Sequence, residues 1–400
     1  MKKIVFLMPF YAFPVPSTMG GGVEELMTIL LEEHAKDIKA DTEFYFITKQ
    51  LYGTNKKLYD SKQEYKNSKI IKIKYNQFLN NCIRATNRVL KKLHINKRFS
   101  NIYYNKAYNE IVKINPDLII MERDYDVITK KLIKKFGKEK LSFHIHTQIL
   151  NKEKIDDYFD SIITVSNFIS EDWKNYLSKS SKMKHFVLPN CVNEDRFIKQ
   201  ISEDERKSLR AKFEFLDDDF VSIFCGRICE DKGIDKLIDA ILRLDDHHKL
   251  LIVGSVSAAN KEKTPFLTKI EEMAKNNPNK IKTTGYIANN ELYKYYECAD
   301  IQIIPSMWEE AAGLVAVEGQ ICGLPQIITK SGGMIEFASP DGTIIIKKDE
   351  NIVSSLMKQI EYLSSNKKIL KEMSEKNKSH GLIFNKKTYY ENFKKIIEKY

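Results

Sequence analysis

The sequence predicts an α/β protein made of two doubly wound, Rossmann-like domains, each with a mainly parallel sheet. The chain has 400 residues, which suits two domains of ordinary size. Hydrophobic residues make up 42% and charged residues 30%, so the chain can bury real cores and is not disordered as a whole. Short apolar runs alternate with amphipathic helical patterns in two successive series. Continuous apolar strands separated by helices indicate parallel sheets covered on both faces.

The first series of strands fills the N-terminal half of the chain. Its members are rich in Ile, Leu, Val and Phe and are expected at Ile4–Met8, Glu43–Ile47, Ile70–Ile73, Leu118–Met121, Leu141–His144 and Ile162–Val165. A helix is expected at 23–36. The first run follows two lysines, as in a signal peptide, but three prolines between residues 9 and 16 interrupt it. We therefore interpret it as a buried strand.

The second series follows a polar stretch at residues 200–207. Its strands are expected at Val221–Phe224, Lys249–Val253, Ile281–Thr284, Ile301–Ile304, Gln326–Ile328 and Gly342–Ile346. Its helices are expected at Ile234–Leu244, Pro265–Asn276, Asn289–Cys298 and Leu314–Cys322. The predicted domains span 1–195 and 196–385. An amphipathic helix in 386–400 ends the chain, and its pattern leaves open whether it packs on the second domain or crosses back to the first.

Cysteine use and hydropathy bear on the compartment. No stretch approaches the ~20 apolar residues that span a bilayer. The six cysteines show no paired spacing typical of a zinc site or a disulfide framework, which favours reduced thiols. We therefore expect a cytoplasmic protein.

One segment carries the whole net charge of +11. Residues 51–140 hold 22 Lys and Arg against 8 Asp and Glu, so the rest of the chain is slightly acidic. Lys91, Lys92, Lys97 and Arg98 lie there in a predicted helix with a positive face. A solvated lysine-rich face, nucleic acid and an anionic membrane surface all fit the charge. No nucleic-acid recognition motif accompanies it, so we expect no nucleic acid and favour docking at the inner face of the plasma membrane.

Two loops have residues suited to phosphate binding. Gly20-Gly21-Gly22 precedes the helix at 23–36, where backbone N–H groups can approach an anion. The dinucleotide-binding spacing is missing, so a plain turn fits equally well. Arg227 and Lys232 follow a strand, at the sheet edge where α/β domains bind ligands. Their guanidinium and ammonium groups suit a diphosphate, although solvated surface cations are the alternative.

A third motif surrounds the start of the helix at 314–322. Gly313 lies at its N-terminus, whose amides can bind a pyrophosphate. Glu310 precedes this turn and Glu318 follows it. A carboxylate is repelled by phosphate but accepts hydrogen bonds from hydroxyls, so the two Glu residues suit a sugar and a ribose on either side of a diphosphate.

Taken in this order, the motifs resemble family 4 of the glycosyltransferases, retaining enzymes with the GT-B fold, in which two Rossmann-like domains face each other across a cleft. The resemblance covers almost the whole chain. It rests on Gly21-Gly22-Val23-Glu24, Pro189-Asn190-Cys191-Val192-Asn193-Glu194-Asp195-Arg196-Phe197, Gly226-Arg227, Lys232-Gly233, Ala299-Asp300, Pro305-Ser306 and Glu310 with Glu318. It implies transfer of a hexosyl or N-acetylhexosaminyl group from a nucleotide-sugar, with a UDP-sugar as the expected donor, to a glycan acceptor that is lipid-linked in the membrane-docked case. Bacterial cell-surface polysaccharide or glycoconjugate synthesis is the implied setting.

The resemblance also implies roles for single residues. In the second domain, Arg227 and Lys232 would bind the donor diphosphate and stabilise the departing charge. Glu310 would hold hydroxyls of the transferred sugar and Glu318 those of the ribose. The diphosphate would also contact the amides of Gly313, Leu314 and Val315.

The first domain would supply fewer groups. The amides of Gly21 and Gly22 would contact the distal phosphate. His146 matches the family's histidine near C6 of the sugar, and His144, two residues away, is the competing assignment. The chain departs from the family pattern at Cys191 and Asn193, usually Gly and Asp, and after Glu310, where Ala311-Ala312 replaces Pro-Phe.

We expect no metal ion and no other cofactor. Asp217-Asp218-Asp219 is interpreted as a solvated turn, and Asp124 with Asp126 is too small a group for a metal site. The cations and the helix N-terminus can stabilise the leaving diphosphate without a metal. Two other functions stay open: a nucleotide-sugar epimerase on the same fold, and a binding protein that has lost turnover.

Overall fold

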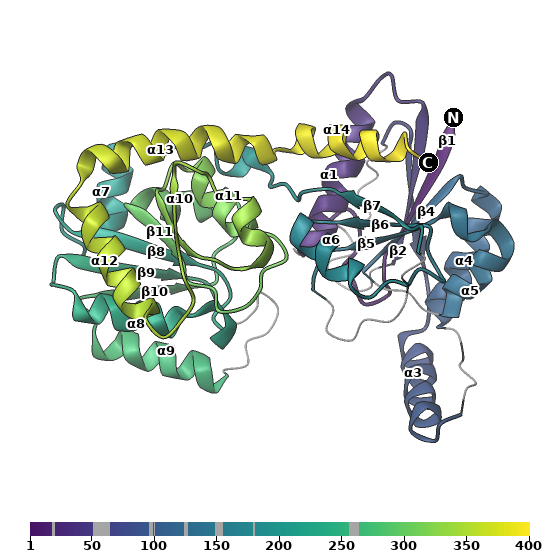
Figure 1. Ribbon diagram of the computed structural model, residues 1–400, viewed down its shortest axis with the longest axis horizontal. Helices are drawn as coiled ribbons and strands as arrows, with labels where there is room; N and C mark the ends of the chain where they lie inside the picture. The colour runs from purple at the N-terminus through teal and green to yellow at the C-terminus, as the bar shows by residue number, and fades with distance from the viewer. Residues whose placement is uncertain are drawn as a thin grey trace. The chain divides into compact units, whose positions relative to one another are not determined.

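The computed structural model describes residues 1–17, 21–50, 65–95, 99, 101–123, 127–148, 155–178, 181–255 and 264–400. The chain divides into two compact units (Figure 1). Unit 1 consists of Met1–Pro189 and Lys386–Tyr400, and unit 2 of Asn190–Asn385. Each unit is a parallel sheet with helices, so the predicted pair of doubly wound α/β domains is confirmed.

The sheet of unit 1 has seven strands in the order β3-β2-β1-β4-β5-β6-β7, all parallel. The strands are β1 (Lys2–Leu7), β2 (Thr42–Lys49), β3 (Ser68–Ile73), β4 (Leu118–Glu122), β5 (Leu141–Ile145), β6 (Ser161–Thr164) and β7 (Lys184–Val187). The accompanying helices include α1 (Gly22–Lys36), α3 (Gln77–Lys92), α4 (Ile102–Ile114), α5 (Val127–Phe136) and α6 (Asn167–Lys174). The sequence pattern missed β7, because this short edge strand is only half-buried and carries a weak apolar signal.

The sheet of unit 2 has six strands in the order β10-β9-β8-β11-β12-β13, again all parallel. The strands are β8 (Phe220–Cys225), β9 (His248–Val253), β10 (Ile281–Gly285), β11 (Ile301–Ile304), β12 (Gln326–Thr329) and β13 (Thr343–Ile346). Its helices are α7 (Glu203–Lys212), α8 (Ile234–Arg243), α9 (Pro265–Asn276), α10 (Leu292–Cys298), α11 (Leu314–Ile321), α12 (Ile352–Ser364) and α13 (Lys367–Gly381). Buried Ile, Leu and Val from the strands and α8, α11 and α12 form its core.

The last helix, α14 (Lys386–Ile397), belongs to unit 1 although it follows unit 2 in the chain. It packs on α1 and on β1, where the rings of Phe393 and Phe6 lie 5.5 Å apart. The Tyr390 hydroxyl and the Lys394 ammonium both donate to the Asp37 carboxylate, at 3.0 and 3.1 Å. The helix therefore adds apolar cover to the first sheet.

The change of unit lies after Pro189, six residues before the predicted boundary at 195. Val192 and Phe197 explain the difference, because both are buried in a core cluster of unit 2. The backbone N–H of Val192 also donates to the carbonyl of Phe384 at 3.1 Å. The Pro-Asn motif thus lies at the junction, and the residues after it are already part of the second core.

Each sheet has one point where the strand order reverses. In unit 1 it lies between β1 and β4, and in unit 2 between β8 and β11. The loops at the carboxyl ends of such strands diverge and leave room for a ligand. Gly226–Lys232 follow β8 and 305–313 follow β11, so the motif residues of unit 2 lie at the reversal point. Among the described residues, no helix is long and apolar enough to cross a bilayer.

Candidate active site

The loops after β8 and β11 are joined by their backbones. The carbonyl of Asp231 accepts hydrogen bonds from the amides of Met307 and Trp308, at 2.8 and 3.2 Å. Gly233 has a φ of +64°, and a Cβ there would lie 2.1 Å from the carbonyl oxygen of Pro305. A larger residue at 233 would therefore separate the loops. This close approach is what brings the predicted diphosphate-binding and sugar-binding residues together.

Lys232 and Glu310 face each other across this junction. The Lys232 ammonium forms an ion pair with Oε1 of Glu310, and both side chains are largely buried. The Ser306 hydroxyl donates to the same oxygen at 2.6 Å, and the amide of Gly333 donates to the Glu310 carbonyl at 2.7 Å. Glu310 is thus held from three sides, and it matches the positive charge of Lys232.

Arg227 differs from Lys232 in its surroundings. It follows Gly226 directly after β8 and is exposed to solvent. It forms no hydrogen bond or ion pair with the other described residues. Its guanidinium is therefore free to bind an anion with two parallel hydrogen bonds.

The N-terminus of α11 adds uncharged donors to this group. No side chain caps the helix at Gly313, so its first amides are not taken up by a capping group of the described chain. Gly313 also packs tightly, since a Cβ there would lie 3.0 Å from Cγ of Met334. The predicted amides of Gly313, Leu314 and Val315 therefore lie at an open helix end that follows Glu310 by a short turn.

Glu318 lies one turn further along α11. Its Oε2 accepts a hydrogen bond from the Tyr296 hydroxyl at 2.9 Å. Burial raises the pKa of Glu318 to about 7, although the Tyr296 hydroxyl and the charge of Arg196 act in the opposite direction. The carboxyl group therefore titrates near neutral pH. Tyr296 was not identified from the sequence, because a tyrosine on an amphipathic helix is more often a plain core residue.

In unit 1, Gly21 and Gly22 lie at the start of α1. Gly22 is the first helical residue, and no side chain caps the helix. Gly21 has a φ of +106°, and a Cβ there would lie 2.2 Å from Oε2 of Glu24. The Glu24 carboxylate accepts a hydrogen bond from the amide of Phe13 at 3.0 Å, so this motif residue secures the preceding loop. Gly20 lies outside the described residues.

His144 and His146 share a third residue that the sequence did not identify. Glu122, the last residue of β4, accepts from Nδ1 of His144 at 3.2 Å and from Nε2 of His146 at 2.7 Å. All three side chains are buried. The strand register explains the contact with His144, because Glu122 and His144 are paired between β4 and β5. The two imidazoles do not compete for one position but lie on the same carboxylate.

The protonation of this cluster follows from its burial. Burial, with a smaller contribution from His144, lowers the pKa of His146 to about 4, so the ring is neutral at pH 7. Burial opposes ionisation of Glu122, but both imidazoles outweigh it and hold its pKa well below the usual range. An ionised carboxylate accepts only, so Nε2 of His146 carries the proton. Its buried Nδ1 then keeps a lone pair, with no hydrogen-bond partner among the described residues.

These three side chains are also of the types that bind divalent metals, with ligand atoms within 4.8 Å of one another. Both oxygens of Glu122 are already engaged by imidazole N–H groups. Of the other acidic groups considered, Asp219 is not solvated as expected. It is buried and accepts from the amide of Leu216 at 2.8 Å, which makes it structural. Asp124 and Asp126 lie outside the described residues.

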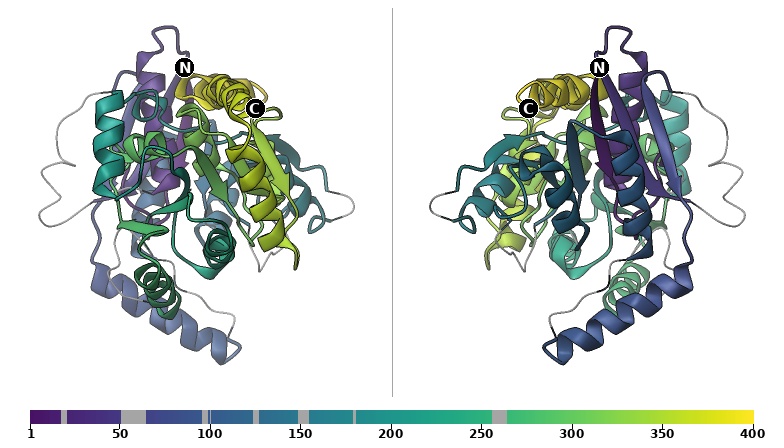
Figure 2. Two further views of the ribbon diagram at one scale, coloured as in Figure 1. Left: turned by 90° about the vertical axis from the view of Figure 1, so that its left-hand side faces the viewer. Right: turned by 90° about the vertical axis from the view of Figure 1, so that its right-hand side faces the viewer.

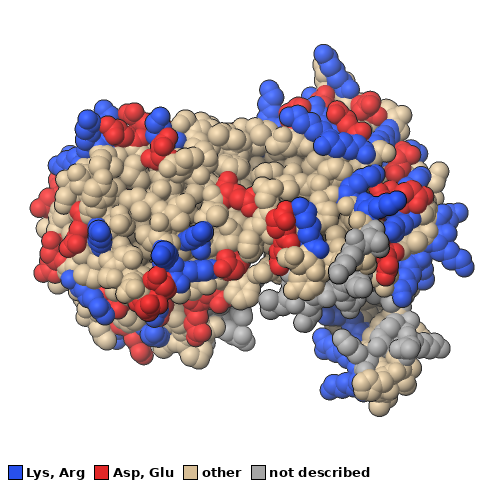
Figure 3. Space-filling model, in the orientation of Figure 1, with Lys and Arg blue, Asp and Glu red and all other residues tan. Residues whose placement is uncertain are grey.

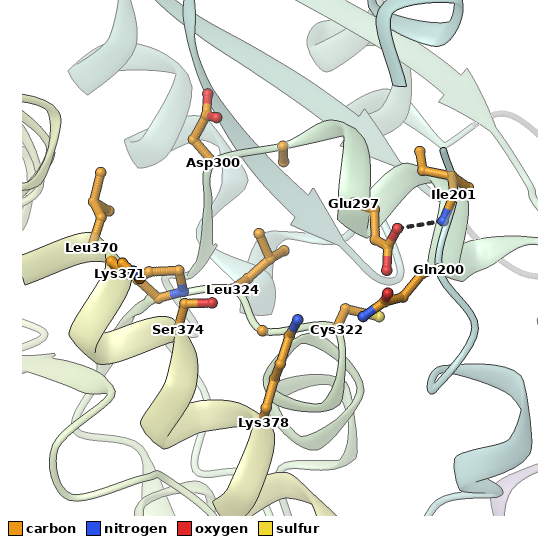
Figure 4. A pocket seen from close by; sticks show the side chains of 13 residues that line it. Gln200, Ile201, Glu297, Asp300, Cys322, Leu324, Leu370, Lys371, Ser374 and Lys378 are labelled. Atoms are coloured by element: carbon orange, nitrogen blue, oxygen red, sulfur yellow. Dashed lines mark hydrogen bonds between the residues drawn. The ribbon is translucent and has the colours of Figure 1, made fainter. Parts of the chain in front are cut away.

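A pocket of about 420 Å³ lies elsewhere in unit 2 (Figure 4). Asp300 and Pro325, which line it, directly precede β11 and β12. The pocket is therefore at the amino ends of the strands, at the edge opposite Lys232 and Glu310. Lys378 and Glu297 also line it. Its position separates it from the candidate active site.

Replacing Glu122 by Gln should destabilise unit 1 by about 1–3 kcal/mol at pH 7, since the amide keeps only one acceptor oxygen for the two imidazole N–H groups and carries no charge. The pKa of Glu122 is lowered on folding, so its contribution is full above the unfolded value near 4.5 and is lost as the pH falls toward 2. The loss should thus shrink below about pH 4. Urea unfolding followed by the buried Trp173 in a Trp308→Phe background measures it.

The exposed Glu139, replaced by Gln, is the matched control and should leave the unfolding midpoint unchanged. An equal loss of stability for Glu122→Gln at pH 7 and below pH 4 would contradict the ionised carboxylate.

Comparison with known proteins agrees with this geometry. Residues 205–380 match the family described as Glycosyl transferases group 1. The lipopolysaccharide 1,2-N-acetylglucosaminetransferase of Salmonella typhimurium is 26% identical over 274 residues, which cover 66% of this chain and 70% of that protein. None of these matches is to an epimerase, and that alternative has no support.

Two solved structures share the fold over the whole chain. A glycosyltransferase from Rickettsia africae has a TM-score of 0.73 at 18% sequence identity, and the match covers 98% of that protein. Anabaena HepE in complex with UDP has a TM-score of 0.72 at 16% sequence identity, and the match covers 100% of that protein. Motifs, fold and the match over residues 205–380 therefore agree, and together they support a glycosyltransferase of the group 1, family 4 type with the GT-B fold.

Proposed function

We propose that this glycosyltransferase moves a hexosyl or N-acetylhexosaminyl group from a nucleotide-diphosphate donor to a glycan acceptor, with retention of configuration and without a metal ion. UDP-sugars are the first donors to test. The observation that carries the proposal is the junction of the β8 and β11 loops, which places Lys232 against Glu310 beside the open end of α11. A cation, a sugar-binding carboxylate and free amides then surround one space.

The diphosphate would lie between Arg227, Lys232 and the amides of Gly313, Leu314 and Val315. Arg227 has no competing partner among the described residues and would bind first. Lys232 is shared, because Glu310 already holds it, and would bridge the phosphate and the carboxylate. The Salmonella relative is named for transfer of N-acetylglucosamine, and the Anabaena structure holds UDP, which supports a UDP-linked hexosamine or hexose as donor.

The two carboxylates would hold hydroxyl groups on either side of the diphosphate. Glu310 keeps Oε2 for the transferred sugar while Lys232 and Ser306 occupy Oε1. Glu318 would accept from the ribose hydroxyls, and Tyr296 holds its carboxyl group in place. Since each carboxylate oxygen has two lone pairs, both residues can bind a sugar without breaking their present contacts.

Unit 1 would supply the amides of Gly21 and Gly22 to the distal phosphate and one imidazole to the transferred sugar. His146 is the proposed catalytic histidine, because it matches the histidine of the family pattern, and its Nδ1 lone pair can accept a hydrogen bond from a sugar hydroxyl. Glu122 would act as its positioning residue by fixing the proton on Nε2.

The proposed reaction is front-face substitution at C1 of the sugar. The bond from C1 to the diphosphate breaks, and the acceptor oxygen forms its bond to C1 on the same face. The acceptor proton passes to an oxygen of the leaving phosphate, so charge and atoms balance. Arg227, Lys232 and the α11 amides stabilise the charge that develops on the leaving group, which is the role a metal ion would otherwise fill.

We further propose that the acceptor is a lipid-linked glycan and that the protein works in the cytoplasm at the inner face of the plasma membrane. Synthesis of bacterial cell-surface polysaccharide or glycoconjugate is the setting. The basic charge of residues 51–140 and the lipopolysaccharide acceptor in the name of the Salmonella relative support this.

Replacing Arg227 or Lys232 by Ala should lower kcat by about 10²–10³-fold, because each removes a group that stabilises the departing charge. A panel of nucleotide-sugars, screened by thermal shift and then by hydrolysis, identifies the donor for this assay. Lys236→Ala, at an exposed position on the neighbouring α8, should retain normal turnover. Unchanged kcat in the Arg227→Ala, Lys232→Ala double variant would contradict the assignment.

Binding of UDP should strengthen as the pH rises from 6 to 8, because Glu318, with a pKa of about 7, accepts ribose hydroxyl bonds best when ionised. UDP itself titrates in this range, so the test is the difference between the wild type and Glu318→Gln, measured by calorimetry. Tyr296→Phe removes a donor that favours the ionised form and should move the midpoint to higher pH. Parallel pH profiles for wild type and Glu318→Gln would place the ribose elsewhere.

A further inference from the structure

Helix α3 is attached to unit 1 by its polar side. Asn80 is buried, and its side-chain oxygen accepts a hydrogen bond from the amide of Ile102 at 3.0 Å. Asn87 exchanges two hydrogen bonds with the backbone of Phe99, at 2.8 and 2.9 Å. The Arg84 guanidinium lies 4.9 Å from the centre of the Phe10 ring. At 100° per residue, Asn80, Arg84 and Asn87 lie on one side of the helix.

The opposite side of α3 is apolar and faces outward. Its largest side chains are exposed, at 77% for Phe78, 50% for Leu79, 55% for Val89 and 62% for Leu93 just past the helix. Figures 1 and 2 show α3 extending away from the sheet of unit 1. A surface helix normally buries its apolar stripe, whereas α3 exposes it.

The charge around this face has one sign. Residues 77–95 contain four Lys or Arg and no Asp or Glu. Arg88 and Lys92 are exposed and, by helical position, border the apolar side next to Phe78 and Val89. On the face shown in Figure 3, the surface of α3 accordingly has Lys or Arg beside uncharged residues, without Asp or Glu.

We propose that α3 is an interfacial membrane helix: Phe78, Leu79, Val89 and Leu93 enter the boundary between headgroups and acyl chains of an anionic bilayer. Arg88 and Lys92 then bind lipid phosphates along its border. Basic residues beside a wide apolar face are the pattern of helices that lie in a bilayer surface. A second copy of the chain would bring a helix of the same positive charge, which opposes that occupant.

The inference deepens the proposed function, and rests on it only for the identity of the acceptor. It changes the role of the basic segment, since charge alone would give a contact that salt abolishes. Insertion of an apolar face gives binding that persists at moderate salt and depends on the outward side chains. The polar attachment of α3 to unit 1 leaves that face free without disturbing the domain core.

The test is co-sedimentation of the full chain with vesicles, either phosphatidylcholine alone or with about one third phosphatidylglycerol, at equal low salt. The wild type should bind the anionic vesicles at least about ten-fold more tightly. Phe78→Ser, Val89→Ser, Leu93→Ser combined should weaken that binding at least about ten-fold. Arg88→Gln with Lys92→Gln should reduce the preference for anionic lipid. Ile38→Ser, which replaces another apolar residue of unit 1 that is 78% exposed, should change nothing.

Equal weak binding of the wild type to both vesicles, or unchanged binding of the triple variant, would overturn the proposal. A triple variant that only converts a dimer to a monomer in light scattering would also overturn it, in favour of a second copy. Circular dichroism and the thermal midpoint should match the wild type, because the replaced side chains face outward. UDP binding on the same samples separates the two proposals: its absence in the wild type would reject the donor site and leave the vesicle result standing.

Discussion

The backbone junction between the loops after β8 and β11 is the constraint on which the candidate donor site depends. Two amides converge on the carbonyl of Asp231, and Gly233 allows an approach to Pro305 that no other residue would permit without displacement. Parallel strands β8 and β11 set the loops side by side, since they are neighbours in the sheet. The main-chain geometry therefore sets the spacing of the functional groups, and it brings the side chains of Lys232 and Glu310 into contact.

That spacing also determines the electrostatics of the candidate site. The charges of Lys232 and Glu310 cancel each other, whereas Arg227 is unmatched among the described residues. The proposed diphosphate would meet one free cation, one shared cation and the open end of α11. Because Lys232 is already ordered by Glu310, binding of a phosphate there would cost little side-chain entropy. The ion pair therefore pre-organises Lys232, and removal of Glu310 would disorder that side chain.

The sequence predicted the fold and most loop positions, because buried parallel strands produce continuous apolar runs and glycine or charged residues mark their ends. It did not predict partners. Glu122 contacts two imidazoles through strand register, and Tyr296 contacts Glu318 across the core of unit 2. Neither contact leaves a spacing signal in the chain. The donor-site roles and the choice of His146 follow from the family resemblance and stay predictions, whereas the grouping of Lys232 with Glu310 is a structural finding.

Motif residues need not share one task. Asp300 of the Ala-Asp motif accepts hydrogen bonds from Arg206 and from the amide of Val221, which joins α7 to the start of β8. Glu24 of the glycine motif holds the loop before α1 in the same way. Both carboxylates maintain the strand and helix ends from which the chemical groups project. A family pattern therefore mixes residues that touch the ligand with residues that position the backbone.

The orientation of α3 illustrates the limit of hydropathy patterns more sharply. An amphipathic pattern shows that a helix has one apolar side, but it does not show which side packs against the domain. In α3, Asn80 and Asn87 determine which side packs on the domain. Their side chains form hydrogen bonds with the backbone of Ile102 and Phe99, respectively. Turning the helix over would leave those groups unpaired. These hydrogen bonds keep the apolar side of α3 outward. An apolar face with a basic border is more complementary to an anionic lipid surface than to water.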